Sequence, residues 1–403
     1  MVVLLKVGNG FRKGETCQVS GYSLAFASWA ISHIDQEGEP CMGEQQDRER
    51  RKHEHIAAVK ALADHGSSGF DDVMLLPASA SEMDVEDVRL DSELLGFKLS
   101  SPIVVNAMTG GTDEAREING RLAAFSARHG LAMALGSETA ALKDPEVAES
   151  YTVARALNPH GLLIANVGMG ADLKAAQMAV DLVDADLLQV HWNTAQELFM
   201  AEGDRHFTGM LEKLKEVSSG LSVPTIAKEV GQGMTGPAAQ NFVDCGVRGV
   251  DIGGVGGTNF IAIEAWRRGL EVDREWQSWG IPTASSLGEV YDTVGSQVHV
   301  IASGGIRSGH DVAKALAMGA TAVGVAGSLM RLVTQDNPDE RLDEWLASVK
   351  WTLTMIMVLT GARTVSELRE CPVLISGRTQ NWLYSRGHDD YCRQLATRGP
   401  RGE

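Results

Sequence analysis

The chain has 403 residues, 44% of them hydrophobic and only 5% aromatic, which is enough to bury a full core in one large α/β domain or two medium ones. Its 36 Lys and Arg residues are outnumbered by 53 Asp and Glu residues, and the net charge of −17 argues against nucleic acid as a partner. Any anionic ligand must therefore be held by a few local groups.

The sequence indicates neither a membrane nor an oxidising compartment. The longest apolar stretch, 351–361, falls short of the roughly 18 residues that a membrane-spanning helix needs. The cysteines are odd in number and form neither a C-x-x-C pair nor a disulfide framework. They are Cys17, Cys41, Cys245, Cys371 and Cys392. We expect a cytoplasmic protein with reduced thiols and no membrane partner.

Residues 1–41 form an extension to which the sequence assigns no role. The apolar stretch 24–31 is interrupted by Ser28 and Trp29 and leads to no small-residue cleavage site, so it does not resemble a signal peptide. Two explanations stay open: an upstream start codon, with Met42 as the natural initiator, or an ordered N-terminal extension. Residues 42–101 are expected to form an N-terminal arm that leads into the main domain.

The arm contains a basic cluster, Arg50-Arg51-Lys52-His53-Glu54-His55, at the start of a predicted helix over 56–65. Cations at a helix N-terminus oppose the helix dipole, and a bound anion would relieve this conflict. In an acidic protein the cluster therefore suggests a phosphate clamp. The alternative is a solvated run of charges.

Eight short apolar runs rich in β-branched residues follow, each ending in Gly or small polar residues. The runs are 103–108, 132–136, 162–167, 187–190, 225–230, 249–252, 298–303 and 322–326. Their spacing mostly fits one strand, one turn, one helix and one return loop, with an insertion in the sixth interval. Helical patterns over 114–129 and 311–318 support this reading.

A closed (β/α)8 TIM barrel over 102–335 explains this pattern better than an open doubly wound sheet. All eight strand ends carry the same kind of polar or Gly-rich tail, and a barrel brings these tails to one mouth. An open sheet would use only the strand ends at one switch point. Residues 336–403 are predicted to form a C-terminal helical cap, in which Trp345, Leu353 and 355–359 belong either to the core or to a subunit interface.

The strand ends supply the candidate site. The tails after the seventh and eighth strands, Ser303-Gly304-Gly305-Ile306-Arg307 and Ala326-Gly327-Ser328, lie where barrels commonly bind phosphate. Lys228 ends a buried strand, where an ammonium group needs an anion such as a flavin, a phosphate or the adjacent Glu229. Asn166 and Ser137 fit either a ligand or a turn.

The most distinctive tail is His191-Trp192-Asn193-Thr194-Ala195-Gln196-Glu197, which follows the apolar run 187–190. It places an imidazole, two amides and a carboxylate at the end of one strand. Burying such groups without partners would cost roughly 1–3 kcal/mol each, so a ligand-facing wall explains them better than a polar turn.

Together these segments resemble the type 2 isopentenyl diphosphate isomerases, from about Asp47 to Gly387. The glycine motifs also occur in many FMN barrels, whereas the basic arm and the His191 segment are specific to this family. The matching motifs are Arg51-Lys52-x-x-His55-Ile56, Met108-Thr109-Gly110-Gly111, His191-x-Asn193-x-x-Gln196-Glu197, Glu202-Gly203-Asp204-Arg205, Lys228-Glu229-Val230-Gly231, Gly256-Gly257-Thr258 and Ser303-Gly304-Gly305-Ile306-Arg307.

The resemblance implies an FMN enzyme that interconverts isopentenyl and dimethylallyl diphosphate in isoprenoid biosynthesis, with flavin kept reduced by NADPH and with Mg²⁺ on the diphosphate. It also implies a homo-oligomer, either tetramer or octamer. FMN would be held by Met108, Thr109, Gly110, Ser137, Asn166, Lys228, Thr258, Gly305, Ile306, Arg307, Ala326 and Gly327. The substrate would meet Arg51, Lys52, His55, His191, Asn193 and Gln196, and Glu197 would hold Mg²⁺.

Shifting a double bond requires that a proton is added at one carbon and removed from another. These motifs contain no obvious pair of strong acid and base, so the resemblance implies that the N5 region of reduced flavin exchanges the protons. Gln196 is the predicted catalytic side chain nearest the reacting carbons. Two residues depart from the family pattern: Trp192 replaces an aliphatic residue, and Glu138 replaces Gln.

Two other functions remain as alternatives. An FMN-dependent 2-hydroxy-acid oxidase or dehydrogenase shares the barrel and the phosphate loop, but it needs a catalytic His, and no His occurs from Val230 to Gln297. A non-catalytic flavin- or phosphate-binding module would explain the glycines. It would leave Gln196, Glu197 and the basic arm without a role.

Overall fold

The computed structural model describes residues 44–62 and 66–399. The predicted extension 1–41, the candidate initiator Met42 and the end of the predicted N-terminal helix at 63–65 lie outside the described residues. The chain divides into two units, 1–44 and 45–403, and nearly all of the described residues belong to the second.

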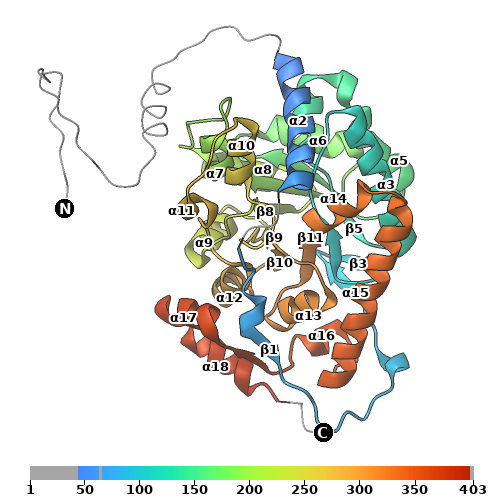
Figure 1. Ribbon diagram of the computed structural model, residues 1–403, viewed down its shortest axis with the longest axis vertical. Coiled ribbons are helices and arrows are strands. Elements are labelled where there is room, and N and C mark those ends of the chain that lie inside the picture. Colours follow the sequence, from blue (N-terminus) through green and yellow to red (C-terminus); the bar gives the residue numbers. More distant parts are fainter. Residues whose placement is uncertain (1–43, 63–65, 400–403) are drawn as a thin grey trace, which may run out of the picture. The chain divides into compact units, whose positions relative to one another are not determined.

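Eight parallel strands close into a barrel, which confirms the predicted fold (Figure 1). Each strand pairs with the next along the chain, and β11 closes the ring against β4. The strands are β4 (Ile103–Val105), β5 (Ala132–Ala134), β6 (Leu163–Gly168), β7 (Leu187–Trp192), β8 (Thr225–Glu229), β9 (Gly249–Asp251), β10 (His299–Ser303) and β11 (Ala322–Val325). Every one of them overlaps one of the predicted apolar runs.

The strand ends differ from the prediction in two places that matter for the site. β4 ends at Val105 rather than at residue 108, so the following residues leave the sheet and enter the barrel mouth. β7 continues two residues beyond the predicted end, because His191 and Trp192 still pair with Lys228 and Glu229 of β8. The imidazole of His191 is therefore held by regular sheet and not by a loop.

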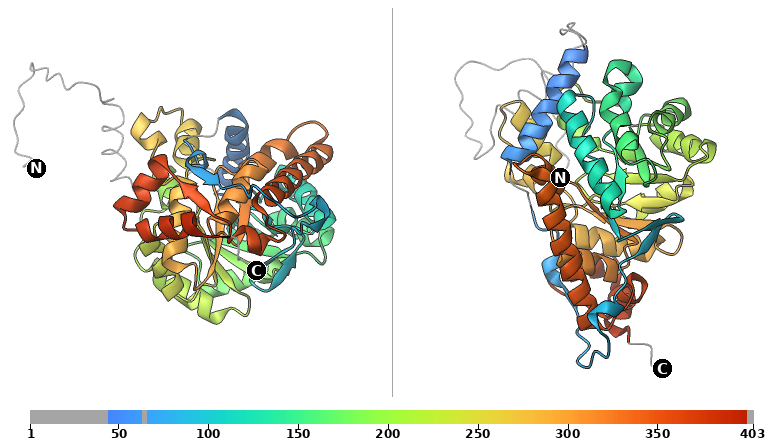
Figure 2. Two further views of the ribbon diagram at one scale, coloured as in Figure 1. Left: turned by 90° about the horizontal axis from the view of Figure 1, so that it is seen from below. Right: turned by 90° about the vertical axis from the view of Figure 1, so that its right-hand side faces the viewer.

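Helices surround the strands, as Figures 1 and 2 show. The connecting helices are α3 (Asp113–His129), α4 (Thr139–Lys143), α5 (Glu149–Leu157), α6 (Leu173–Val183), α7 (Thr194–Phe199), α8 (Met210–Gly220), α9 (Gly236–Asp244), α10 (Phe260–Arg267), α11 (Arg274–Gln277), α12 (Thr283–Val294), α13 (Gly309–Ala317) and α14 (Gly327–Val333), with the 3-10 helix η3 (Pro145–Val147). Helices α10 to α12 fill the long interval between β9 and β10, where the insertion was expected.

Local capping explains where the two predicted crossover helices begin. The Thr112 side chain accepts a hydrogen bond from the backbone N–H of Ala115 at 3.1 Å, so α3 starts at Asp113. Ser308 and Asp311 form a reciprocal capping box, so α13 starts at Gly309, two residues before the predicted start.

The closed end of the barrel is filled by apolar side chains that point inward from alternate strand positions. These are Val104, Ala132, Ala134, Leu162, Ile164, Leu187, Ile226, Ile301 and Ala322. A hairpin formed by β2 (Ser92–Leu94) and β3 (Phe97–Leu99) packs Leu94 and Leu99 against this cluster. The sequence analysis did not predict this hairpin, which closes the barrel opposite the mouth.

The C-terminal region forms the predicted helical cap, with elements α15 (Pro338–Thr360), α16 (Val365–Leu368), β12 (Val373–Ile375), α17 (Gly377–Ser385) and α18 (Asp389–Thr397). Helix α15 packs against α13 and α14. Leu353 and Met357 are completely buried, which assigns them to the core. Trp351 and Leu359 on the same helix are exposed in the single chain.

An unpredicted strand pair joins the two ends of the described chain. β1 (Val73–Leu75) pairs antiparallel with β12, and it is preceded by the 3-10 helix η1 (Phe70–Asp72) and followed by η2 (Val85–Asp87). The Asp72 carboxylate accepts hydrogen bonds from both the backbone N–H and the hydroxyl of Thr379. The segment that carries the basic arm is thus attached to the C-terminal cap.

The N-terminal helix, α2 (Glu44–Ala61), begins well before the predicted start at residue 56. Arg51 and Lys52 lie about two turns inside the helix, and the expected conflict between their charges and the N-terminal dipole is wrong. Ile56 and Ala58 are buried, and they attach α2 to the barrel.

No helix of the described part is long and apolar enough to cross a membrane. Cys245, Cys371 and Cys392 are free and buried, as expected for reduced thiols. Cys17 and Cys41 lie outside the described residues.

Replacing Leu353 by Ala should lower the free energy of unfolding by about 2–5 kcal/mol, because the change leaves a cavity between α15 and the barrel. The matched control is Ser348→Ala, an exposed position on the same helix, which should change stability by less than about 0.5 kcal/mol. Chemical denaturation followed by circular dichroism measures both. Equal, small effects would show that α15 does not contribute to the core.

Candidate functional site at the mouth of the barrel

Above the apolar cluster at the closed end of the barrel, the inward-facing side chains are polar. We call six of them the polar layer: Asn106, Asn166, Gln189, Lys228, Asp251 and Ser303. Each is at most 7% exposed. Buried polar groups need partners, so the hydrogen bonds within this layer determine how each member is oriented.

Asp251 lies at the centre of the polar layer. Its carboxylate accepts hydrogen bonds from the Lys228 ammonium at 2.9 Å, from the Asn106 amide at 2.7 Å and from the Ser303 hydroxyl. The anion that Lys228 was expected to need is therefore the Asp251 carboxylate on the neighbouring strand β9. Glu229 points out of the barrel, and its carboxylate accepts the backbone N–H groups of Gln232 and Gly233 at 2.7 and 2.9 Å.

A chain of amides connects Asp251 to His191. Gln189 donates to Asn106 at 3.4 Å and to Asp251 at 3.5 Å, and Asn166 donates to the Gln189 carbonyl at 3.2 Å. The Asn166 carbonyl then lies 2.7 Å from His191 Nδ1, which must carry the proton of this hydrogen bond. Burial, together with the charges of Lys52 and Lys228, lowers the pKa of His191 to about 4. The imidazole is neutral near pH 7.

Two adjoining cavities open above the polar layer, and Lys228, Met108, Lys52 and His55 line both of them. The smaller cavity lies among the Gly-rich tails of β9, β10 and β11. It is lined by eight of the residues predicted to hold the cofactor: Met108, Thr109, Lys228, Thr258, Gly305, Ile306, Ala326 and Gly327. Ser137 and Asn166, also predicted, line the larger cavity.

The glycine tails form a backbone cradle around the smaller cavity. Gly304 has φ +108°, and a Cβ atom there would lie 2.0 Å from the Gly254 carbonyl oxygen, so only Gly fits. The Arg307 guanidinium donates to the carbonyl of Gly305 at 2.8 Å and to that of Gly256, which ties two tails together. Arg307 lines neither cavity.

Gly110 does not face either cavity. A Cβ atom at this position would lie 2.1 Å from the Tyr151 ring, so the glycine permits close packing behind the mouth. Its neighbour Thr109 does line the smaller cavity, and the Thr109 hydroxyl is buried without a hydrogen-bond partner among the described residues. Such an orphaned hydroxyl fits a polar ligand in the cavity.

The larger cavity brings together all the residues predicted to bind substrate and metal. These are Arg51, Lys52 and His55 from α2, and His191, Asn193, Gln196 and Glu197 from β7 and α7. Burial and the nearby Arg51 charge lower the pKa of Lys52 to about 8. No carboxylate of the described chain pairs with Lys52, so a cationic group of the arm is available to an anion in this cavity.

The Glu197 carboxylate is held at the rim of the larger cavity. Its Oε1 accepts the Asn193 amide at 2.8 Å, and its Oε2 accepts the backbone N–H of Asp204 at 2.9 Å. Asn193 also donates to the Gln196 carbonyl at 3.3 Å. The described residues contain no cluster of three or more His, Cys, Asp or Glu side chains suited to a metal ion. A cation at Glu197 would therefore need ligand oxygens and water as further ligands.

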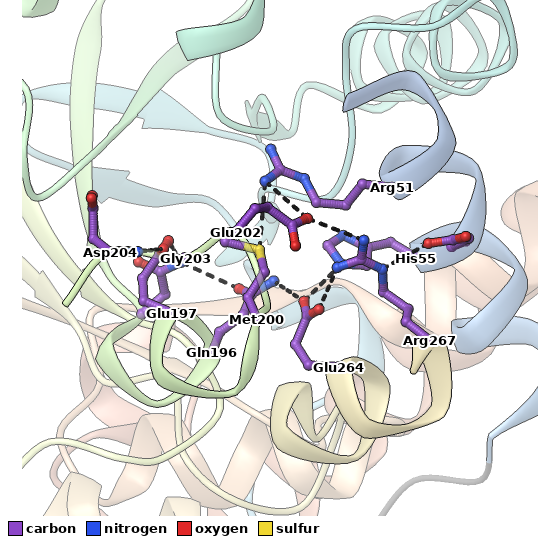
Figure 3. A network of polar contacts seen from close by, with 12 residues as sticks. Arg51, His55, Gln196, Glu197, Met200, Glu202, Gly203, Asp204, Glu264 and Arg267 are labelled. Atoms are coloured by element: carbon purple, nitrogen blue, oxygen red, sulfur yellow. Dashed lines mark hydrogen bonds and ion pairs between the residues drawn. The ribbon is translucent and has the colours of Figure 1, made fainter. Parts of the chain in front are cut away.

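Glu264 of α10 joins the arm to the wall of the larger cavity (Figure 3). Its completely buried carboxylate lies 2.8 Å from His55 Nε2, accepts the Gln196 amide at 2.9 Å and forms an ion pair with Arg267 at 2.5 Å. Although burial opposes ionisation, these hydrogen bonds and the Arg267 charge lower the pKa of Glu264. The Gln196 amide is thus fixed at both ends.

The arm is also tied down by a second carboxylate, Glu202. Arg267 donates to Glu202 at 3.1 Å, and Arg51 lies 3.7 Å from the same oxygen. The Arg267 Nε donates to Glu54 of α2 at 2.9 Å. Arg51, Glu54 and His55 of the basic cluster are therefore part of a network of ion pairs and hydrogen bonds across the mouth.

Asp251 and Glu264 were not predicted from the sequence. Both carried a readable signal, since each is a single carboxylate inside an otherwise apolar run, 249–252 and 260–266. A lone acid in such a run must be paired or bound to a ligand. The strand alternation of β9 would also have directed Asp251 toward the barrel interior.

The two departures from the family pattern lie behind the cavities. Trp192 points outward and packs against Phe242, with ring centroids 4.8 Å apart. Glu138 is completely buried; one carboxyl oxygen accepts the Asn166 backbone N–H at 3.2 Å, and the other has no partner among the described residues. Burial raises the pKa of Glu138 well above its ordinary value.

Comparison with known proteins identifies relatives over most of the chain. The model of the FMN-dependent dehydrogenase family matches residues 169–373. An isopentenyl-diphosphate delta-isomerase of Geobacillus sp. (strain WCH70) is 43% identical over 343 residues, covering 85% of this chain and 97% of the relative. The enzyme of that name from Symbiobacterium thermophilum is 42% identical over 363 residues, covering 88% and 99%.

Solved structures share the barrel at much lower identity. A putative lactate oxidase of Pediococcus acidilactici superposes with a TM-score of 0.61 at 16% identity, covering 85% of this chain and 97% of the other. A mandelate oxidase with a monooxide FMN adduct has a TM-score of 0.57 at 18% identity, covering 82% and 100%. At these identities the likeness shows the fold alone.

Replacing Glu138 by Gln should raise thermal stability increasingly as the pH rises. The unfolded chain ionises Glu138 from about pH 4.5, whereas burial shifts its ionisation in the folded chain to higher pH, so between these two pKa values the wild type loses on the order of 1 kcal/mol per pH unit. Gln keeps the hydrogen bond and cannot ionise. Melting temperatures at pH 5, 6 and 7 test this, with the exposed Glu146→Gln as the control. If the difference in melting temperature between the Glu138→Gln variant and the wild type did not change with pH, the expectation would be contradicted.

Proposed function

This chain belongs to the family of isopentenyl-diphosphate delta-isomerases, and from that membership we propose that it interconverts isopentenyl and dimethylallyl diphosphate with reduced FMN and Mg²⁺. The observation that carries the proposal is the junction of two cavities. A backbone-lined cradle opens directly into a cavity that combines a cationic arm, fixed amides and one carboxylate. A barrel that bound flavin alone would not need the second set of groups.

FMN fits the smaller cavity. Its phosphate requires backbone N–H groups approached without interference from side chains, which the glycine tails of β10 and β11 provide. Its ring requires polar contacts, for which the unpartnered Thr109 hydroxyl and the Lys228 ammonium are available. Thr258 completes the rim. When bound and reduced, FMN would supply the group that gives and takes protons at the allylic carbons.

The diphosphate fits the larger cavity beneath α2. Arg51 and Lys52 provide positive charge there, and the pKa of His55 is lowered because burial outweighs the opposing hydrogen bond to Glu264. Glu197 would bind Mg²⁺ together with diphosphate oxygens and water, since Mg²⁺ retains much of its hydration shell. The metal would then neutralise part of the negative charge of the diphosphate.

The protein residues act on the alkene by position and charge rather than by strong acid–base chemistry. Gln196 is held through its carbonyl by Asn193 and through its amide N–H by the ionised Glu264. A fixed dipole backed by a buried carboxylate stabilises positive charge that develops on the substrate carbons. We therefore assign Gln196 as the catalytic side chain and Glu264 as the residue that positions it.

An oxidase of 2-hydroxy acids is less well supported, although the solved neighbours include such enzymes. That chemistry needs a base to take the hydroxyl proton, and residues 230–297 contain no His. His299 lies at the closed end, where its Nδ1 accepts the Leu95 N–H at 3.4 Å. The tails of β8 and β9 thus offer no imidazole to the cavities.

The remaining parts of the proposal follow from family membership. We propose NADPH as the reductant of the flavin, the cytoplasm as the compartment and a homo-oligomer of four or eight chains as the assembly. The exposed apolar residues Trp351 and Leu359 on α15 offer surface for subunit contacts.

The direct test is to incubate the purified protein with isopentenyl diphosphate, FMN, NADPH and Mg²⁺ and to follow dimethylallyl diphosphate by NMR. We expect product only when all components are present. Replacing the substrate by a 2-hydroxy acid, with flavin reduction as the readout, tests the oxidase alternative. Flavin reduction by the hydroxy acid without isomerised product would overturn the proposal.

Glu197→Gln should reduce Mg²⁺-dependent turnover on the order of 100-fold and raise the Mg²⁺ concentration needed for half-maximal activity, because the amide is a poor Mg²⁺ ligand. FMN binding, measured by flavin fluorescence, should be unchanged, since Glu197 does not line the smaller cavity. Glu216→Gln on the exposed face of α8 is the control. Loss of flavin from the Glu197 variant would show that the carboxylate serves the cofactor instead.

A further inference from the structure

The ion pair between Lys228 and Asp251 has no role in the reaction as proposed so far. The ammonium lies 2.9 Å from the carboxylate, and the two side chains are 9% and 0% exposed. Lys228 lines both cavities, whereas Asp251, its partner in the strand register, lines neither. A carboxylate that no ligand can reach must act through the groups that it contacts.

Every other contact of Asp251 is with a neutral donor. The Asn106 amide, the Ser303 hydroxyl and the Gly253 N–H bind its two oxygens, and Gln189 lies at 3.5 Å. Lys228 is therefore the one cation that faces Asp251 among the described residues of the polar layer. The layer as a whole is close to neutral only because these two charges cancel.

We propose that Asp251 is a positioning residue for the cofactor: it fixes the Lys228 ammonium at the floor shared by the two cavities and balances its charge, so that bound flavin faces a neutral ion pair. This inference rests on the proposed binding of FMN. It assigns a function to a residue that contacts neither cofactor nor substrate.

The physical basis is the charge that a flavin gains on reduction. A nearby net positive charge stabilises the reduced form, and a nearby net negative charge stabilises the oxidised form. In a buried site such interactions are weakly screened. With Asp251 present, the reduced state is favoured by the short-range contact of Lys228 but not by a net charge on the barrel floor.

The test measures the reduction potential of FMN in the purified holoenzyme by spectrophotometric titration against a redox dye. In Asp251→Asn the Lys228 charge is no longer balanced, so the ratio of reduced to oxidised flavin at a fixed potential should rise by about tenfold or more. In Lys228→Met the ratio should fall. The double variant removes both charges, and its potential should lie between those of the two single variants.

The double variant also controls for misfolding of the single variants, because removing both partners of a buried ion pair leaves no unpaired charge. Retention of FMN by the double variant but not by Asp251→Asn would support charge balance. Loss from both would overturn it. The matched control is Asp186→Asn, which removes an ion-paired carboxylate 3.0 Å from Arg155 at the opposite end of the barrel and should leave the potential unchanged.

The proposed function and this inference fail in different ways. A wild-type protein that forms no dimethylallyl diphosphate would contradict the proposed function, whatever its flavin potential. A wild-type protein that is active, with an Asp251→Asn potential equal to its own, would contradict this inference alone.

Discussion

The buried carboxylate of Asp251 is the constraint on which the upper half of the barrel depends. It can only accept hydrogen bonds, so Lys228, Asn106 and Ser303 must all present donors to it. Gln189 also donates to Asp251, so its side-chain carbonyl accepts the Asn166 amide. The Asn166 carbonyl is thereby directed at His191 and determines that Nδ1 carries the proton. A single acceptor at the floor of the site therefore orients a side chain in the wall of the larger cavity.

The larger cavity depends in turn on three helices that meet at Glu264. His55 comes from α2, Gln196 from α7 and Arg267 from α10 itself, and all three contact this one carboxylate. The oxidases with the same barrel are only 16–18% identical in sequence. The residues at the mouth can therefore differ although the barrel is shared. In this chain the mouth is built around carboxylates that hold neutral amides and imidazoles in place.

All eight barrel strands could be predicted because each lies in a continuous apolar run, rich in β-branched residues, that ends in Gly or small polar residues. The residues of the larger cavity were predictable because they stand together in two motifs, at 51–55 and 191–197. Glu264 and Asp251 could have been recognised as lone acids in apolar runs, but their partners could not be predicted, since most of them lie far away in sequence. Three-residue strands such as β1 and β12 carry too little pattern to be recognised, and the start of α2 lies in a polar stretch without apolar periodicity.

The pairing of β1 with β12 has a consequence for folding. Its partners are contributed by the two ends of the described chain, as in the hydrogen bond from Ser376 to the Asp72 carbonyl across 304 positions. Contacts of such long range form late, after the barrel between them is in place. During synthesis β1 leaves the ribosome early but can pair only after β12 has emerged. A chain that ends before β12 would then hold α2 only through its contacts with the barrel, such as the buried Ile56 and the hydrogen bond between His55 and Glu264.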